Sequence, residues 1–236
     1  MRTIPFRFTG FRRFTIGCLL VMIGALSSHA QSPELLAEQI RETYSKIESI
    51  KFSFSQTTSG QTAGRPRTGK GTAIFAREQD RHLMRWNYLW PDPQVVISDG
   101  TTISMYFEKL NQMIISPVDK TRSDVLFSFF TATEPLSTHF AVLPADLETN
   151  TAPEASSGLH ALQLQPLDSD TQIKSIHVWI DNHSIIRRIE LLDYFDTQTT
   201  INLSHIEINP LDMSNKQDLA ERFTFVPPDG TEIIRQ

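Results

Sequence analysis

Residues 86–100 read W-N-Y-L-W-P-D-P-Q-V-V-I-S-D-G, and this stretch decides the fold. Aromatic side chains occupy every second position up to the Trp-Pro pair, an apolar run begins after Gln94, and Asp99-Gly100 follows it. A period of two is typical of a half-buried strand, and Asp-Gly between two such runs is a strong hairpin signal. The stretch therefore predicts consecutive antiparallel strands joined by tight turns.

The same period continues on both sides of this stretch. Phe52 and Phe54 alternate with serines upstream, and Ile103, Met105 and Phe107 alternate with other residues downstream. We expect about ten strands, which is too many for a small flat sheet, so the sheet should curl strongly or nearly close. The expected strands are 51–55, 71–75, 83–88, 94–98, 103–107, 113–116, 159–165, 173–180, 185–192, 199–208 and 222–226.

One strong helix signal precedes the strands. Residues 32–34 are Ser-Pro-Glu, which supply an N-cap, a proline at the first helical position and an acid in the first turn. Leu36, Ile40, Tyr44 and Ile47 follow at spacings that place them on one face. A helix with one apolar stripe must lie against another part of the protein.

The period of two breaks in the middle of the chain. Val125-Leu126 and Phe129-Phe130 fit a short helix with an apolar face that ends before Pro135. Residues 139–143 are interpreted as another short helical or irregular piece. Within 199–208 the apolar positions change parity, which predicts a β-bulge.

The first thirty residues have the pattern of a secretory signal peptide. Four arginines precede an apolar stretch at 14–26, and Ser28-His29-Ala30 supplies a small-residue cleavage site. We expect cleavage after Ala30. Arg12-Arg13 is a poor match to a twin-arginine signal, and Cys18 lies inside the apolar stretch, where it does not fit a lipidation site.

Cleavage would leave residues 31–236 as the mature domain. It removes four arginines and no acid, which changes the formal net charge from −5 to −9, and it removes the single cysteine. We therefore expect one soluble, acidic domain in the periplasm, stable without disulfides. The acidic balance argues against nucleic acid as a partner.

Motifs for catalysis are missing from the sequence. It has no G-x-S-x-G, P-loop, G-x-G-x-x-G or H-E-x-x-H, and the mature histidines are scattered. Most aspartates lie beside turn signals. We expect no enzyme activity, no metal and no cofactor. The alternating aromatic residues then either fill a core or line a cavity for a hydrophobic ligand.

Four stretches together are similar to one known family. The quoted stretch continues T-T-I-S-M-Y-F-E-K-L-N-Q, residues 222–232 read R-F-T-F-V-P-P-D-G-T-E, residues 47–56 read I-E-S-I-K-F-S-F-S-Q, and Gly69 and Gly71 form a G-x-G. Taken in their order along the chain, these stretches resemble the LolA family of periplasmic lipoprotein carriers. The resemblance spans residues 35–232, although the middle of the chain matches only in pattern.

The resemblance implies a fold, a function and partners. LolA-like proteins form an unclosed, strongly curved antiparallel β-barrel with an α-helical lid over a hydrophobic cavity. They would take triacylated lipoproteins from an inner-membrane ABC transporter and deliver them to the outer-membrane receptor LolB. A monomeric carrier is expected. The residues implied to face the acyl chains or form the lid are Leu36, Ile40, Tyr44, Phe54, Met84, Trp86, Tyr88, Met105, Leu126, Phe129 and Phe130.

The family also has an arginine that holds the lid closed by hydrogen bonds to lid carbonyls. Counting from Gly71 places it at Arg77, whereas counting back from Trp86 points to Arg81. The chain departs from the family here, because Glu78 replaces the usual proline. Both arginines therefore remain candidates for this lid clasp.

Three other functions fit parts of the sequence. A periplasmic lipid- or lipoprotein-sensing regulatory protein can share the fold, but such proteins usually have a second C-terminal domain. A LolB-like receptor would need an acylated cysteine, which Cys18 does not suit. A secreted lipid hydrolase would need a nucleophile or a metal, and the sequence offers neither pattern.

Overall fold

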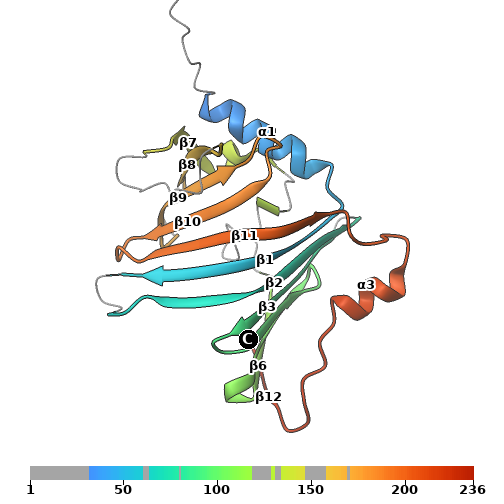
Figure 1. The fold of residues 1–236 in the computed structure, drawn as a ribbon. Coiled ribbons are helices and arrows are strands. Elements are labelled where there is room, and N and C mark those ends of the chain that lie inside the picture. Colours follow the sequence, from blue (N-terminus) through green and yellow to red (C-terminus); the bar gives the residue numbers. More distant parts are fainter. Residues whose placement is uncertain are drawn as a thin grey trace, which may run out of the picture. The chain divides into compact units, whose positions relative to one another are not determined.

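The computed structural model describes residues 32–60, 64–79, 81–118, 129–130, 134–146, 158–168 and 171–236, which belong to one compact unit from Gln31 to Gln236. Strands dominate this unit (Figure 1). Its elements are α1 (Pro33–Ser45), β1 (Ser49–Ser59), β2 (Arg67–Glu78), β3 (Arg81–Trp90), β4 (Gln94–Ser98), β5 (Thr102–Phe107), η1 (Glu108–Leu110), β6 (Gln112–Pro117), η2 (Leu136–Thr138), β7 (Phe140–Pro144), β8 (His160–Pro166), β9 (Ile173–Ile180), β10 (Ile186–Asp193), β11 (Gln198–Ile208), α3 (Lys216–Arg222) and β12 (Glu232–Arg235).

A single 12-stranded sheet contains all these strands, in the order β12-β6-β5-β4-β3-β2-β1-β11-β10-β9-β8-β7. Neighbouring strands are antiparallel except β12 and β6, which are parallel. The two edge strands, β12 and β7, do not pair with each other, so the curled sheet is unclosed (Figure 1). The predicted fold class is therefore confirmed, while the helical lid remains a prediction.

The quoted stretch forms the hairpins that it predicts. Residues 86–90 end β3, residues 94–98 are β4, and Asp99-Gly100 turns the chain into β5. The Asp99 carboxylate accepts hydrogen bonds from the backbone N–H groups of Thr101 (2.8 Å) and Thr102 (2.7 Å), and Gly100 adopts a φ of 87°. The two hydrogen bonds hold the turn in place. Glycine suits position 100, because most side chains would be strained at this positive φ.

The two faces of the sheet bury separate apolar clusters. On one face, which we call the inner face, Phe52, Ala73 and Trp86 are direct cross-strand neighbours and lie in the main core. On the opposite, outer face, Ile74 and Leu83 join a smaller cluster. The alternation seen in the sequence therefore separates two environments, as the pleat of a strand requires.

Helix α1 begins where the sequence predicts. The Ser32 hydroxyl accepts a hydrogen bond from the Leu35 N–H (3.3 Å), and Pro33 is the first helical residue. The buried face of α1 consists of Leu36, Ala37, Ile40 and Tyr44. This face joins the main core, and the helix contacts β7 and β8.

The C-terminal part differs from the sequence prediction. The expected strand at 222–226 is wrong, because residues 216–222 form α3 and the following residues pair with no strand. Leu219 and Phe223, four residues apart, pack into the outer cluster, and Phe225 packs on Tyr106 with ring centroids 5.0 Å apart. The alternating aromatic residues therefore pack against the outer face of the sheet and do not form a strand. The last strand of the chain is β12, which begins at Glu232.

Two further predictions concern single strands. The expectation of a helical or irregular piece at 139–143 is wrong, because most of these residues form the edge strand β7, which pairs with β8. The predicted bulge in β11 is confirmed: Lys51 pairs with Glu207 and Ser53 with Ser204, which leaves one extra residue in β11. His205 in this bulge has a φ of 50°.

Candidate functional site

Five aromatic rings meet on the inner face of the sheet. Phe130 packs on Phe75 (centroids 4.6 Å apart) and on Phe52 (5.2 Å), while Phe54 packs on Trp86 (4.4 Å). Phe52 also meets Trp86 edge to face at 5.7 Å. These rings come from β1, β2, β3 and Phe130, so they form a continuous aromatic surface on the inner face, and Phe130 covers the rings of β1 and β2.

The structure gathers most of the residues implied by the family resemblance around this surface. Trp86, Met84, Phe54, Phe129 and Phe130 are buried in the same core as the inward residues of α1, which are Leu36, Ile40 and Tyr44. Leu126 lies outside the described residues.

Two predicted residues lie at the edge of the aromatic surface and are only partly buried. Tyr88 packs on Phe54 and donates a hydrogen bond to the Gln56 side-chain oxygen (2.8 Å). Met105 is the cross-strand neighbour of Val96, which in turn pairs with Trp86, so Met105 lies on the inner face. The surface thus extends from β1 to β5.

Sequence reasoning did not assign Phe52 and Phe75 to this site. Both are buried and contact Trp86 and Phe130. A signal was available for Phe52, because it lies two residues before Phe54 and so shares its face. Phe75 could be found only through its pairing with Met84, which the sequence does not reveal.

Of the two arginine candidates, Arg77 contacts α1. Its guanidinium donates hydrogen bonds to the carbonyl oxygens of Tyr44 (2.9 Å) and Ser45 (3.0 Å), and its backbone N–H donates to the Glu48 carbonyl (2.8 Å). The last carbonyls of a helix have no partner within the helix, and a cation beside them also complements the helix dipole. Arg77 therefore ties the C-terminal end of α1 to strand β2.

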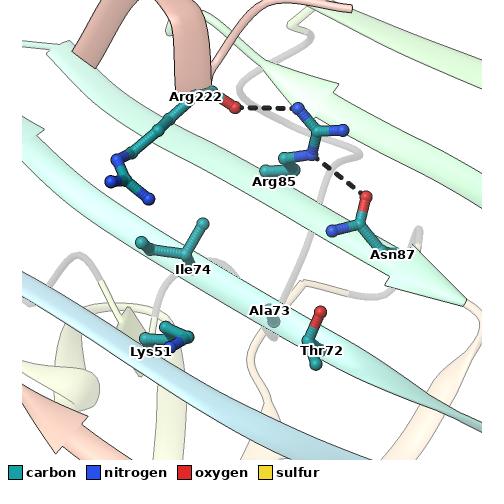
Figure 2. Close-up of a pocket in the computed structure, with 7 residues that line it drawn as sticks. All are labelled: Lys51, Thr72, Ala73, Ile74, Arg85, Asn87 and Arg222. Atoms are coloured by element: carbon teal, nitrogen blue, oxygen red, sulfur yellow. Dashed lines mark hydrogen bonds between the residues drawn. The ribbon is translucent and has the colours of Figure 1, made fainter. Parts of the chain in front are cut away.

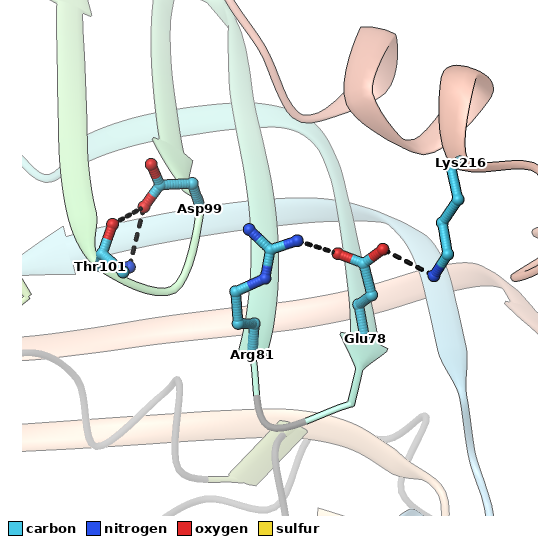
Figure 3. Close-up of polar contacts among 5 residues, drawn as sticks. All are labelled: Glu78, Arg81, Asp99, Thr101 and Lys216. Carbon is cyan, nitrogen blue, oxygen red and sulfur yellow. Dashed lines mark hydrogen bonds and ion pairs between the residues drawn. The ribbon is translucent and has the colours of Figure 1, made fainter.

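Arg81 is engaged elsewhere. It pairs with Glu78, whose second carboxylate oxygen accepts a hydrogen bond from the Lys216 ammonium group at 2.7 Å (Figure 3). The hydrogen bond from Lys216 lowers the pKa of Glu78, with a smaller contribution from Arg81. This trio connects the turn between β2 and β3 to α3, on the outer side of the sheet.

Tyr44 forms a second polar link between α1 and the sheet. Its hydroxyl accepts a hydrogen bond from the Ile186 N–H of β10 (3.1 Å), and burial raises the pKa of this phenol well above its ordinary value. The pairing of β10 with β9 is irregular between Ile186 and Arg188, so the tyrosine satisfies an amide at a break in the ladder. Tyr44 thus meets β2 through its carbonyl and β10 through its hydroxyl.

One buried polar group lies within the aromatic surface. The indole nitrogen of Trp86 makes no hydrogen bond of standard geometry within the described ranges, but its N–H interacts with the Tyr88 hydroxyl and so partly offsets the larger rise that burial gives to the pKa of Tyr88. Across the same described ranges, no cluster of three His, Cys, Asp or Glu side chains could hold a metal ion. The site therefore offers mainly apolar contact.

Comparison with known proteins identifies the family. The family model "Outer membrane lipoprotein carrier protein LolA" matches residues 45–216, which is more than half of the chain. The chain belongs to the LolA family. The predicted membership is thus confirmed, and the match covers the five strands β1–β5 that form the aromatic surface as well as Arg77.

Relatives within the LolA family share modest identity with this chain. Proteins named outer-membrane lipoprotein carrier protein from Albidiferax ferrireducens and Bordetella avium are 29% and 27% identical, over 74% and 84% of this chain and 76% and 86% of their own lengths. A solved structure of an uncharacterized conserved protein from Thermus thermophilus superposes with a TM-score of 0.50 at 12% identity, over 87% of this chain and 100% of that one. At this identity the superposition shows the fold alone.

Proposed function

We propose that this protein is a periplasmic carrier that shields the acyl chains of lipoproteins between the inner and the outer membrane. The observation that supports this function best is the aromatic inner face, which α1 and the Phe129–Phe130 segment cover in a LolA-family chain. Relatives named as lipoprotein carriers support the same function. Catalysis, a metal and a cofactor have no part in it.

The physical requirement for such a carrier is large apolar area. Transfer of an acyl chain from the membrane to water costs about 0.8 kcal/mol for each CH₂ group, so three free chains could not cross the periplasm unprotected. The buried aromatic and aliphatic side chains of the inner face can replace the membrane interior for these chains. Aromatic rings suit this role because each contributes a large contact area.

The covering elements must move for a ligand to enter. Phe130 packs on Phe52 and Phe75, so acyl chains would take the place of this ring once Phe130 is displaced. The described polar links between α1 and the rest of the unit are few, chiefly those of Arg77 and Tyr44. A cover held by few contacts can open on loading without an energy source of its own.

Trp86 offers a specific contact for the polar end of an acyl group. Its buried indole N–H lies among apolar rings and faces the Tyr88 hydroxyl without a hydrogen bond of standard geometry, so a better-placed acceptor would be favourable. The carbonyl oxygen of an ester or amide bond that links an acyl chain to the lipoprotein could accept this hydrogen bond. The ligand would then give this donor an acceptor in better geometry than the Tyr88 hydroxyl.

The transport route completes the proposal. Residues 1–30 would act as a signal peptide, and the mature protein would work as a monomer. It would receive triacylated lipoproteins from an inner-membrane ABC transporter and pass them to LolB. Arg77 would hold the α1 end of the cover closed before loading, whereas Arg81 would not take part.

Site-specific photo-crosslinking tests this function. A photoreactive amino acid replaces Met105, which lies on the inner face, or Ser104, its neighbour on the outer face of the same strand. We expect Met105, but not Ser104, to crosslink to the acyl chains of a co-expressed lipoprotein. Equal labelling from both positions, or none from Met105, would contradict the proposed binding surface.

A further inference from the structure

A second recess lies on the outer face of the sheet. It has a volume of about 300 Å³ and is lined by Lys51, Thr72, Ala73, Ile74, Arg85, Asn87 and Arg222 (Figure 2). Lys51, Ile74 and Arg85 are cross-strand neighbours on β1, β2 and β3, and Arg222 ends α3. The recess is therefore separated from the aromatic surface by the sheet itself.

The lining is basic, although the protein carries a net negative charge. Three of the seven lining residues are cations and none is an acid. Lys51 pairs with Glu207 (2.9 Å), and Arg222 pairs with Asp218 (2.7 Å), both outside the lining. Two of the three cations that line the recess therefore have a carboxylate partner, and the third has none among the described residues.

That residue is Arg85, which lies on β3, the strand next to Ile74 of β2. Its Nη1 donates hydrogen bonds to the carbonyl oxygens of Arg222 (3.0 Å) and Thr224 (3.3 Å), and its Nε donates to the Asn87 side-chain oxygen (3.1 Å). All three acceptors are neutral, and no carboxylate within the described ranges pairs with this guanidinium. A partly buried cation without a counter-charge is unfavourable, so an anion in the recess would be stabilised.

The donor set distinguishes phosphate from a simple carboxylate. Lys51 and Arg222 already have carboxylate partners, so a ligand must bring more charge and more acceptor oxygens than one carboxylate to compete for them. A phosphate group does both, and it can also accept from the Thr72 hydroxyl and the Asn87 amide, which line the same recess. The volume of about 300 Å³ suits a phosphate on a small polar group.

We propose that this outer recess binds the phosphate group of a small phosphate ester or of a phospholipid headgroup, through Lys51, Arg85 and Arg222. Binding here is independent of acyl-chain binding, because the two sites lie on opposite faces of the sheet. The net negative charge of the protein repels anionic ligands. A basic recess would let the protein bind such a ligand at one place on its surface.

The test is an NMR titration of the ¹⁵N-labelled mature chain at constant ionic strength. Three ligands are added separately: inorganic phosphate, glycerol 3-phosphate and phosphatidylglycerol vesicles. Each titration is repeated with Lys51→Gln and with a matched control, Lys174→Gln. Lys174 is also a strand lysine, with a similarly exposed side chain and an ion pair to Asp196 (3.6 Å). Arg85→Gln, with the fold checked by its spectrum, tests the cation that has no carboxylate partner in the described part of the chain and should weaken binding as well.

We expect saturable shifts of the amides that line the recess, and loss of one charged donor in Lys51→Gln should weaken binding about tenfold. The Lys174→Gln variant should bind like the unmodified protein. A response to glycerol 3-phosphate identifies soluble phosphate esters as the source, and a response to vesicles alone identifies the lipid headgroup. Absence of saturation with all three ligands, or equal weakening in both lysine variants, would overturn the proposal.

Discussion

The guanidinium of Arg77 on β2 and the carbonyl oxygen of Tyr44 on α1 lie 2.9 Å apart, and the hydroxyl of the same tyrosine accepts a hydrogen bond from Ile186 on β10. Strands β2 and β10 are separated by β1 and β11 in the sheet. One helical residue therefore joins two distant strands across the inner face. We infer that displacement of α1 breaks both links together.

Arg77→Lys should loosen the end of α1. A lysine keeps the charge but loses the planar fork that reaches two carbonyls, so we expect a loss of about 1–3 kcal/mol in local stability. Hydrogen exchange of the α1 amides, measured by mass spectrometry, should accelerate in this variant. Arg81→Lys is the control, because Arg81 pairs with Glu78 and contacts no carbonyl of α1. Equal acceleration in both variants would contradict the assignment of the clasp to Arg77.

Tyr44→Phe should destabilise the whole unit. The substitution keeps the ring but leaves the buried Ile186 N–H without an acceptor, which costs about 1–3 kcal/mol. Urea unfolding measures the change. Tyr194→Phe is a matched control because Tyr194 is 60% exposed, and it should change the midpoint little. An unchanged free energy of unfolding in Tyr44→Phe would mean that water or another group replaces the hydroxyl.

Gly71→Ala should be destabilising where Gly69→Ala is not. A Cβ at position 71 would lie 1.8 Å from the Asn87 carbonyl oxygen and 2.9 Å from the Phe54 ring, whereas at position 69 the nearest atoms are 3.4 Å away. Relief of the clash must shift β3 or Phe54, which costs about 1–3 kcal/mol or more. Thermal unfolding of the two variants, compared with the unmodified protein, checks this difference. Similar melting temperatures for both would show that the strands adjust freely at Gly71.

Mild acid should lower the stability of the fold. Burial lowers the pKa of His82 and His177 below the ordinary value of 6.5, and for His82 the charge of Arg77 adds to this effect. The histidines of the unfolded chain therefore bind protons at a higher pH than those of the folded chain. As the pH drops under about 6.5, the free energy of unfolding decreases, and it becomes constant once the pH is lower than the folded pKa values.

Urea midpoints between about pH 7.5 and pH 5.5 test this prediction, since that window spans the unfolded pKa of histidine. His82→Gln should flatten the decline, and His183→Gln, at an exposed turn, should not. Carboxylates whose pKa is lowered, such as Asp99 and Asp181, keep their contribution above the ordinary value of 3.8 and lose it as the pH falls from there through their lower folded pKa values. A flat profile for the unmodified protein in this window would contradict the histidine assignment.

Local signals predicted most of the fold. Ser32-Pro33 fixes the start of α1, Asp99-Gly100 fixes a hairpin, and the parity change in β11 corresponds to a bulge at His205. Each of these features depends on a few neighbouring residues. The inner-face positions of Phe54 and Trp86 follow from the same alternation, which explains why the candidate site could largely be named in advance.

The errors arose where contacts with distant segments decide the structure. Residues 222–226 alternate like a strand, yet Phe223 and Phe225 dock onto the outer face of a sheet formed much earlier in the chain. The sequence did contain a signal for α3, because Asn215 is its N-cap and accepts a hydrogen bond from the Asp218 N–H. The alternating aromatic residues that follow favoured a strand prediction instead. The outer recess could not be foreseen, since Lys51, Arg85 and Arg222 come together only through sheet pairing and the docking of α3.

Native mass spectrometry tests the central claim most directly. The mature protein is purified from the periplasm without detergent, after co-expression with a lipoprotein destined for the outer membrane. We predict a one-to-one complex with the triacylated lipoprotein. Replacement of the buried Phe130 by glutamate should abolish this complex, whereas replacement of the exposed Phe195 by glutamate should not. Recovery of the ligand-free protein alone, together with failure to take up lipoprotein from inner-membrane vesicles, would contradict the carrier function.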